Sequence, residues 1–195
     1  VETYVNPRKA EWPEAEFVVG NPPFVGNKRM RAVLGDGYVE ALRKVHDDVP
    51  ESADIVMYWW NHAAALVRAG KLTRFGLITT NSITQSFNRR VVESYLGAGV
   101  GFRLAFAIPD HPWVDSADGA AVRVAMTAAD GRSDPGRQDL VVFEGEAIED
   151  APHVIVRSAI GKVNATLGVL ADTSSAVQLQ ANSGLAFRGV TLVGS

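Results

Sequence analysis

Four consecutive residues, Asn21-Pro22-Pro23-Phe24, carry groups that could bind a planar base with an exocyclic amine. The Asn21 side chain offers an oxygen acceptor, and Pro22 offers a backbone carbonyl held in a restricted conformation. Together these two groups could accept both protons of one amino group. Phe24 adds a flat apolar face on which the ring could stack. The motif is therefore a candidate binding site for an aromatic amine.

Such a pocket would assist methyl transfer to nitrogen. An aromatic amine is a poor nucleophile because its lone pair is delocalised into the ring. Two acceptors around the amine favour the pyramidal nitrogen whose lone pair faces the methyl donor, and this stabilisation is expressed mainly in the transition state. The alternative is structural: an Asn-Pro turn can simply end a strand and reverse the chain.

Two apolar runs are expected to position this motif. Phe17 to Val19 is typical of a buried parallel strand, and Gly20 with the prolines stops it. Arg74 to Thr80 predicts a second buried strand, which ends in Asn81-Ser82. Open α/β sheets place ligand sites at the carboxyl ends of their strands. We therefore expect Thr79 to Ser82 to line the same crevice as the motif.

The apolar spacing predicts helices at residues 38–47, 53–69 and 87–96. Ser52 or Asp54 is expected to cap the second helix, and Gly70 to end it. The stripe of this helix that should pack on the sheet contains Ile55, Val56, Trp59, Ala63, Leu66 and Val67. Tyr58 and Trp60 could form a platform for base stacking, but aromatic residues at helical spacing usually belong to a core.

Arg103 to Ile108 and Ala120 to Thr127 are two further expected strands. The loop between them is too short for a crossover helix, so they should pair antiparallel. The acidic and histidine residues of this loop are Asp110, His111, Asp115 and Asp118. They could serve a metal or acid-base site, but Asp is also what a turn requires, and no metal site is predicted. Trp113 could form the opposite wall for a stacked base.

The chain on either side of these elements gives weaker signals. Residues 1–15 read as a connector that enters the first strand. We expect an exposed turn at residues 130–139, short strands at 140–143 and 153–156, and a helix at 160–170. Residues 185–193 suggest one more strand.

The composition is that of an ordinary globular domain with a core, because 47% of the 195 residues are apolar and 21% are charged. The absence of cysteine excludes disulfides, thiolate zinc sites and cysteine nucleophiles. No run of 18 apolar residues and no secretory leader is present, so we expect a cytoplasmic protein without a membrane partner.

The net charge of −3 does not exclude a nucleic acid partner, because binding depends on where the cations lie. Three cations, Lys28, Arg29 and Arg31, follow the motif between glycine residues. They could contact phosphates, and the alternative is a solvated loop.

In this order, the elements resemble the second half of the catalytic domain of adenine-N6-specific DNA methyltransferases. Gly20 to Met30, Ser52 to Trp60 and Phe75 to Arg90 are similar to the single-chain type IIL restriction enzymes, which fuse an endonuclease and a methyltransferase. The resemblance covers residues 10–130. It implies an α/β, Rossmann-like class I methyltransferase fold that is partial, with the second half of the sheet as parallel strands plus an antiparallel pair.

The resemblance also implies roles for individual residues. Asn21, Pro22, Pro23 and Phe24 would be catalytic: Asn21 and Pro22 would hold the target adenine amine, and Phe24 would stack on the flipped base. S-adenosylmethionine would be the methyl donor, with Asn21 also contacting it. The residues that would contact double-stranded DNA are Lys28, Arg29, Arg31, Asn81 and Trp113.

The family also needs a glycine-rich turn and an acidic residue on earlier strands, and the sequence contains neither. We therefore expect residues 1–130 to be the second half of the methyltransferase domain, starting just before its fourth strand. Residues 131–195 would be its end and a linker toward a target-recognition domain. The remainder of the domain would be a partner, the chain alone would be inactive, and the free edge of its first strand could drive self-association.

Two other functions stay open at this point. The chain could be a non-catalytic α/β module that binds nucleic acid or a partner through the same edge. It could also be an unrelated small-molecule methyltransferase, because the same signature serves transfer to glutamine and other amide-like nitrogens.

Overall fold

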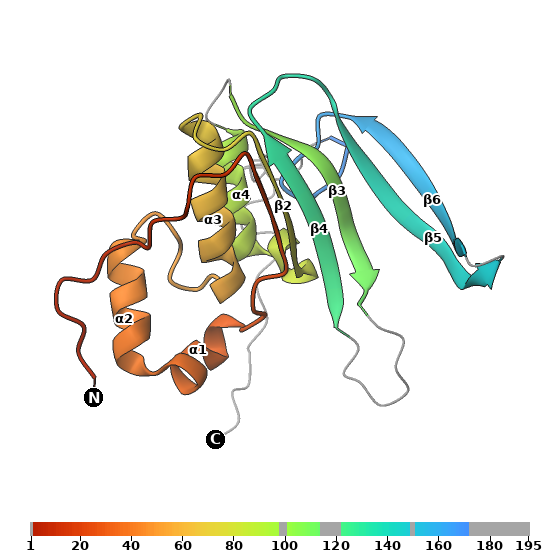
Figure 1. Cartoon of the computed structure of the whole chain (residues 1–195). Coiled ribbons are helices and arrows are strands. Elements are labelled where there is room, and N and C mark those ends of the chain that lie inside the picture. The colour runs from red at the N-terminus through yellow and green to blue at the C-terminus, as the bar shows by residue number, and fades with distance from the viewer. Residues whose placement is uncertain (1, 98–100, 114–121, 149–150, 172–195) are drawn as a thin grey trace, which may run out of the picture.

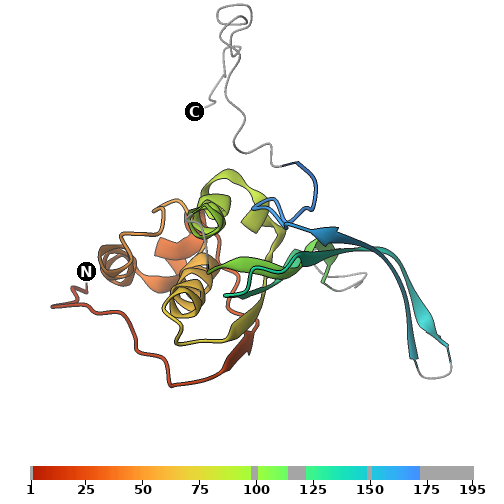
Figure 2. The same ribbon diagram turned by 90° about the horizontal axis from the view of Figure 1, so that it is seen from above.

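The structure is a computed structural model that describes residues 2–97, 101–113, 122–148 and 151–171. The helices of these ranges are α1 (Asn27–Leu34), α2 (Asp36–Val45), α3 (Ile55–Arg68), the 3-10 helix η1 (Asn81–Thr84) and α4 (Ser86–Leu96). The strands are β1 (Phe17–Gly20), β2 (Arg74–Thr80), β3 (Arg103–Pro112), β4 (Arg123–Asp130), β5 (Gly136–Ile148) and β6 (Ala151–Gly161). Figures 1 and 2 show the helices gathered on one side of the sheet.

The described strands form one sheet in the order β1-β2-β4-β3-β5-β6. β1 pairs parallel with β2, and β4 pairs antiparallel with both β2 and β3. The fold is therefore mixed α/β with parallel and antiparallel pairs, as predicted. The short connection between β3 and β4 explains why β4 runs back beside β3, where it separates β3 from β2.

The core lies between α3, α4 and the sheet. Trp60 is 0% exposed, and its ring meets those of Phe75 and Tyr95 edge to face. Its indole Nε1 donates a hydrogen bond to Thr127 Oγ1 at 3.2 Å. Tyr58 is also buried. The core interpretation of Tyr58 and Trp60 is confirmed, and neither ring forms a platform for bases.

The stripe predicted for α3 is wrong at one position. Trp59 is 43% exposed, because the buried face of the helix runs through Val56, Trp60 and Val67 instead. The predicted end of the helix is confirmed: Gly70 follows it with φ 68° and donates its N–H to the carbonyl of Val67.

The burial predicted for β1 is also wrong. Phe17 and Val19 are 59% and 87% exposed, whereas Val18 packs against the core. β1 is the first strand of the sheet order, so its outer edge has no neighbour among the described strands. The exposure of Phe17 and Val19 shows that the other described elements leave these two side chains largely uncovered. Within the described residues, β1 thus has the unpaired edge expected from the sequence.

The C-terminal part differs from the prediction in three ways. β5 and β6 are much longer than the short strands expected, and they form a ribbon that leaves the body of the molecule (Figure 2). Residues 162–171 contain no helix. The Asn164 side chain instead organises turns there, since its Oδ1 accepts hydrogen bonds from Thr166 and Gly168. The strand expected at residues 185–193 lies outside the described residues.

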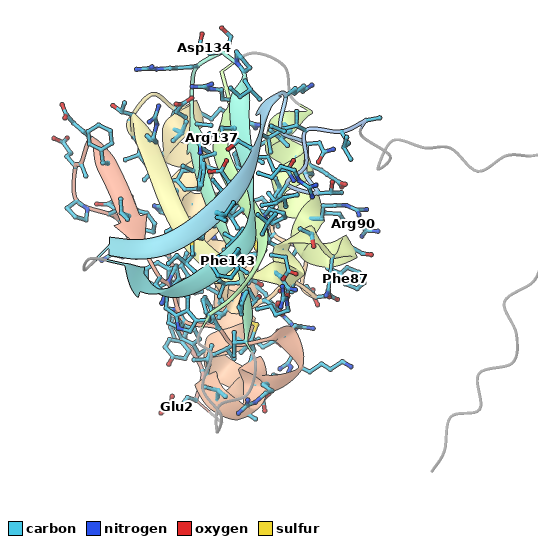
Figure 3. The ribbon with its side chains drawn as sticks, turned by 90° about the vertical axis from the view of Figure 1, so that its right-hand side faces the viewer. Glu2, Phe87, Arg90, Asp134, Arg137 and Phe143 are labelled. Carbon is cyan, nitrogen blue, oxygen red and sulfur yellow. The ribbon has the colours of Figure 1, made fainter. Side chains whose placement is uncertain are left out.

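The segment expected as an exposed turn contains a buried carboxylate. Asp130 is 1% exposed and accepts hydrogen bonds from the guanidinium groups of Arg74 and Arg103. This ion pair joins the ends of β2, β4 and β3. Figure 3 views the molecule from the side of the β5–β6 ribbon, with Arg137 and Phe143 on it and Phe87 and Arg90 on α4.

Within the described ranges, no helix combines the length and the apolar composition needed to cross a bilayer.

Candidate active site

The motif emerges at the carboxyl end of β1. Gly20 pairs in register with Leu77, and β2 continues from there to Thr80 before it passes into η1. The two strands run parallel, so their carboxyl ends lie at the same edge of the sheet, as predicted. Thr79 does not line this edge, because its side chain is buried on the helix side, whereas Thr80, Asn81 and Ser82 are half-buried.

The four motif residues differ in exposure. Asn21 and Pro23 are exposed, whereas Pro22 and Phe24 are half-buried. Phe24 packs against the core cluster, which anchors its ring. Among the described residues, no hydrogen bond engages the Asn21 side chain. Asn21 is thus exposed to solvent three residues before an anchored, half-buried aromatic ring, so neither residue is fully enclosed in the protein.

The three cations after the motif lie on a helix, which rules out the solvated loop that was the alternative to phosphate contact. Lys28, Arg29 and Arg31 are exposed residues of α1, which Met30 anchors in the core. Arg31 forms ion pairs with Asp36 and Glu40 of α2. Neither Lys28 nor Arg29 forms an ion pair within the described part of the chain. Lys28 and Arg29 are therefore the cations of α1 that could meet an anion directly.

Asn81 and Trp113 lie at the same edge of the sheet as the motif. Asn81 Nδ2 donates to Asp110 Oδ1 at 3.0 Å, and Arg123 holds the same carboxylate with Nε at 2.6 Å. The hydrogen bond from Arg123 lowers the pKa of Asp110. Trp113 is 42% exposed, and its backbone N–H donates a hydrogen bond to the backbone carbonyl of Val122, at the base of the β3–β4 connection.

The metal interpretation of this connection gains no support. His111 pairs with Glu144 of the β5–β6 ribbon at 3.2 Å, and Asp110 is bound by Arg123. Asp115 and Asp118 lie outside the described residues. The part of the chain that the structure describes contains no group of three or more His, Asp or Glu side chains able to hold an ion.

Sequence reasoning missed the role of Asp54. Asp54 precedes α3, as expected of a cap, but its side chain makes no capping hydrogen bond to that helix. Its carboxylate instead accepts hydrogen bonds from Asn27, Ser82 and Asn88 at 2.8 Å each. These partners lie on α1, η1 and α4. No sequence signal distinguishes this arrangement from an ordinary cap.

Sequence reasoning also missed a cavity of about 500 Å³ between the N-terminal segment, α2 and α3. Trp12 stacks on His62 at its wall, with ring centroids 4.5 Å apart. His62 of α3 is half-buried, and burial lowers its pKa. None of the four motif residues lines this cavity.

Comparison with known proteins gives a family and a solved structure. The family described as "MmeI, DNA-methyltransferase domain" matches residues 2–141. The type IIL restriction-modification enzyme MmeI, solved in complex with DNA, is 26% identical to this chain, with a TM-score of 0.57. The match covers 80% of this chain and 20% of MmeI, so the chain spans about one fifth of that enzyme's length.

A protein from Vibrio vulnificus YJ016, described as a modification subunit of a type I restriction enzyme, is 14% identical with a TM-score of 0.48. That match covers 79% of this chain and 38% of the other. No curated protein sequence matches the chain.

Proposed function

Because the chain belongs to the family of MmeI DNA-methyltransferase domains, we propose that it carries the target-base half of a DNA adenine-N6 methyltransferase in a type IIL restriction-modification enzyme. The observation that carries the proposal is the exposed Asn21 at the carboxyl end of a parallel strand, followed three residues later by the anchored ring of Phe24. Binding of a flipped base requires hydrogen-bonding groups and an aromatic face at the carboxyl edge of the sheet, where Asn21 and Phe24 lie.

In the proposed reaction, Asn21 Oδ1 and the Pro22 carbonyl accept the two protons of the adenine amine. Phe24 stacks on the flipped base, and Pro23 keeps the corner rigid between them. The adenine nitrogen would receive the methyl group that the bound cofactor supplies, with the cofactor sulfur as the leaving group, and one N6 proton would pass to water. The two acceptors are fixed in advance, so they stabilise the developing charge without reorganisation.

S-adenosylmethionine would supply the methyl group as an electrophilic sulfonium. Of the described residues, Asn21 is the one we assign to this cofactor, and its exposed amide fits a contact on the open side of β1. The rest of the cofactor pocket would come from strands that pair with the free edge of β1. The exposed Phe17 and Val19 on that strand support this assembly, because sheets with parallel strands are normally covered on both faces.

Double-stranded DNA is the proposed substrate. Lys28 and Arg29 would contact phosphates near the flipped base, because α1 begins three residues after Phe24. Asn81 keeps a half-buried amide at the adjoining strand end, and Trp113 offers an exposed ring there. We assign both to contacts with the DNA around the target base. Arg31 would contribute least to DNA binding, because it already forms ion pairs with two carboxylates.

Mass spectrometry of methylated nucleosides would test the proposal. The complete enzyme, incubated with DNA and S-adenosylmethionine, should produce N6-methyladenine, and its Asn21→Ala variant should produce far less while still binding DNA. Methylation of cytosine, or of a protein or small-molecule amide, would contradict the proposal. DNA binding without any methylation by the unaltered enzyme would instead support a non-catalytic nucleic-acid-binding module.

A further inference from the structure

Asp54 stands at the N-terminus of α3 but contributes no side-chain cap to it. An aspartate at this position normally accepts a hydrogen bond from a backbone N–H of its own helix. Here Oδ1 accepts from the Asn27 backbone N–H, and Oδ2 accepts from Ser82 Oγ and Asn88 Nδ2, all at 2.8 Å. The carboxylate is therefore used to join other elements.

The three donors come from the segments that surround the motif. Asn27 is the first residue of α1, three positions after Phe24. Ser82 lies in η1, directly after β2. Asn88 lies in the first half of α4. One carboxylate thus connects the segment that leaves the motif to the neighbouring strand end and to a helix of the core.

A backbone contact reinforces the same junction. The Ile55 N–H donates to the carbonyl of Val25 at 3.0 Å, so the segment after Phe24 is held at two positions, Val25 and Asn27. β1 fixes the motif at Gly20, and the Asp54 junction fixes it again at Val25 and Asn27. Only four residues, the motif itself, lie between Gly20 and Val25. A span this short with both ends held has little freedom.

The direction of each hydrogen bond around the Asp54 side chain is determined by its partners. Asn88 Oδ1 accepts the Asp54 backbone N–H at 2.9 Å, so its Nδ2 must face the Asp54 carboxylate. The Asn27 N–H approaches the other carboxylate oxygen. Both sides of the Asp54 side chain therefore face donors. A negative charge also suits this place, because the N-termini of α1 and α3 both point toward it.

We infer that Asp54 is a positioning residue for methyl transfer, which holds Asn21 and Phe24 in the geometry that the flipped base requires. The inference rests on the proposed function of these two residues. Asp54 touches no substrate in this role; it acts through the segment from Val25 to Asn27. A misplacement of a reacting group by about 1 Å can cost roughly 100-fold in rate.

Asp54→Asn is the sharpest variant because it keeps the size of the side chain. Whichever way the new amide is turned, its NH2 group faces either the Asn27 N–H or Asn88 Nδ2, so one contact becomes donor against donor. Asp48→Asn is the matched control. Asp48 accepts hydrogen bonds from Asn61 at 2.7 Å and Lys9 at 3.2 Å, but none of its partners touches the motif segment.

Single-turnover methylation by the complete enzyme separates the outcomes. We expect Asp54→Asn to lower the rate about 100-fold at saturating DNA, with KM for DNA changed less than threefold. Hydrogen–deuterium exchange should rise in residues 21–34 or 80–90 and stay unchanged elsewhere. Asp48→Asn should keep the rate within about threefold. Equal rates for the two variants, corrected for the folded fraction, would overturn the inference.

A second variant guards against simple misfolding. Asp54→Asn combined with Asn88→Asp restores one charge and one donor–acceptor pair between positions 54 and 88. We expect it to regain about tenfold of the lost rate, although Asn88→Asp itself removes the hydrogen bond that Asn88 Nδ2 donates to the Ser82 carbonyl. No recovery in a double variant that folds normally would contradict the role of the pair. A fully active Asn21→Ala variant would contradict the proposed function itself. An inactive Asn21→Ala variant together with an active Asp54→Asn variant would contradict only the positioning role of Asp54.

Discussion

Gly20 pairs in parallel register with Leu77, so β1 ends where β2 still has three residues to run, to Thr80. At a rise of about 3.3 Å per residue, β2 extends roughly 10 Å beyond the end of β1. Asn21 therefore follows the end of β1, and the last three residues of β2 extend beyond that end. We propose that the flipped base would lie beside this protruding end of β2.

Phe24→Ala should lower methylation by 10- to 100-fold, because stacking of a base on an aromatic ring contributes about 1–3 kcal/mol. The ring also packs against the core, so the variant should unfold at lower denaturant concentration. Phe24→Tyr keeps the aromatic face and should retain most of the activity. Rates and urea unfolding curves measured on both variants distinguish stacking from loss of fold: equal rates for the two would count against the stacking role.

Removal of the free cations of α1 should weaken DNA binding in a salt-dependent way. Each phosphate contact contributes a slope near −0.9 to the plot of log binding constant against log salt concentration. We expect Lys28→Ala and Arg29→Ala each to reduce the steepness of this plot by about one unit. Arg31→Ala should change it less, because Arg31 is paired with Asp36 and Glu40.

Lys44→Ala is the control for this measurement, since Lys44 is an exposed cation of α2. Fluorescence anisotropy with a DNA duplex at several salt concentrations gives the slopes. If Lys44→Ala lowered the slope as much as Lys28→Ala and Arg29→Ala, the assignment of phosphate contacts to α1 would be wrong.

Asp130→Asn should destabilise the protein by about 2 kcal/mol at neutral pH, between the values for exposed and buried ion pairs, because Arg103 would lose its buried partner. Burial raises the pKa of Asp130, but hydrogen bonds from Arg103, Arg132 and Arg74 outweigh burial and hold it below the ordinary 3.8. Its contribution to stability is therefore complete above that value and is lost as the pH falls through the lowered pKa.

Chemical unfolding between pH 3 and 7 measures this contribution. Asp134→Asn is the matched control, because Asp134 is an exposed partner of the same arginine at 3.9 Å. The difference in unfolding free energy between the unaltered protein and Asp130→Asn should shrink as the pH falls toward 3. A constant difference over this range would show that the charge of Asp130 contributes nothing.

The free edge of β1 should make the isolated chain associate with itself. An unpaired edge strand with exposed apolar residues invites pairing with another strand. Val19→Lys places a charge at the most exposed residue of β1 and should reduce the mass measured by sedimentation velocity. An isolated chain that stays monomeric at about 100 µM would contradict this prediction.

The sequence predicted those parts of the fold that local patterns determine. The strand before Asn21, the strand ending at Thr80 and the helix over residues 55–68 follow from apolar periodicity and from terminating Gly and Pro. The antiparallel return of β4 follows from the short connection before it. The position of Asn21 at the carboxyl end of a parallel strand could therefore be foreseen.

Other parts depend on contacts between distant segments. The burial of Asp130 depends on Arg74 and Arg103, which lie 56 and 27 residues away in the chain. The sequence suggests that Asp54 caps a helix, because its actual hydrogen-bond partners, Asn27 and Asn88, lie 27 and 34 residues away in the chain. The turns after Gly161 depend on one side chain, Asn164, rather than on a repeating pattern. Local periodicity contains none of this information.

The central claim is that Asn21 and Pro22 hold the adenine amine during methyl transfer, and the single-turnover rate of Asn21→Ala tests it most directly. The complete enzyme should bind DNA with nearly unchanged affinity but, at saturating S-adenosylmethionine, methylate about 100- to 1,000-fold more slowly, as expected when one fixed hydrogen-bonding group is lost from a transition state. A rate within threefold of the unaltered enzyme would contradict the claim.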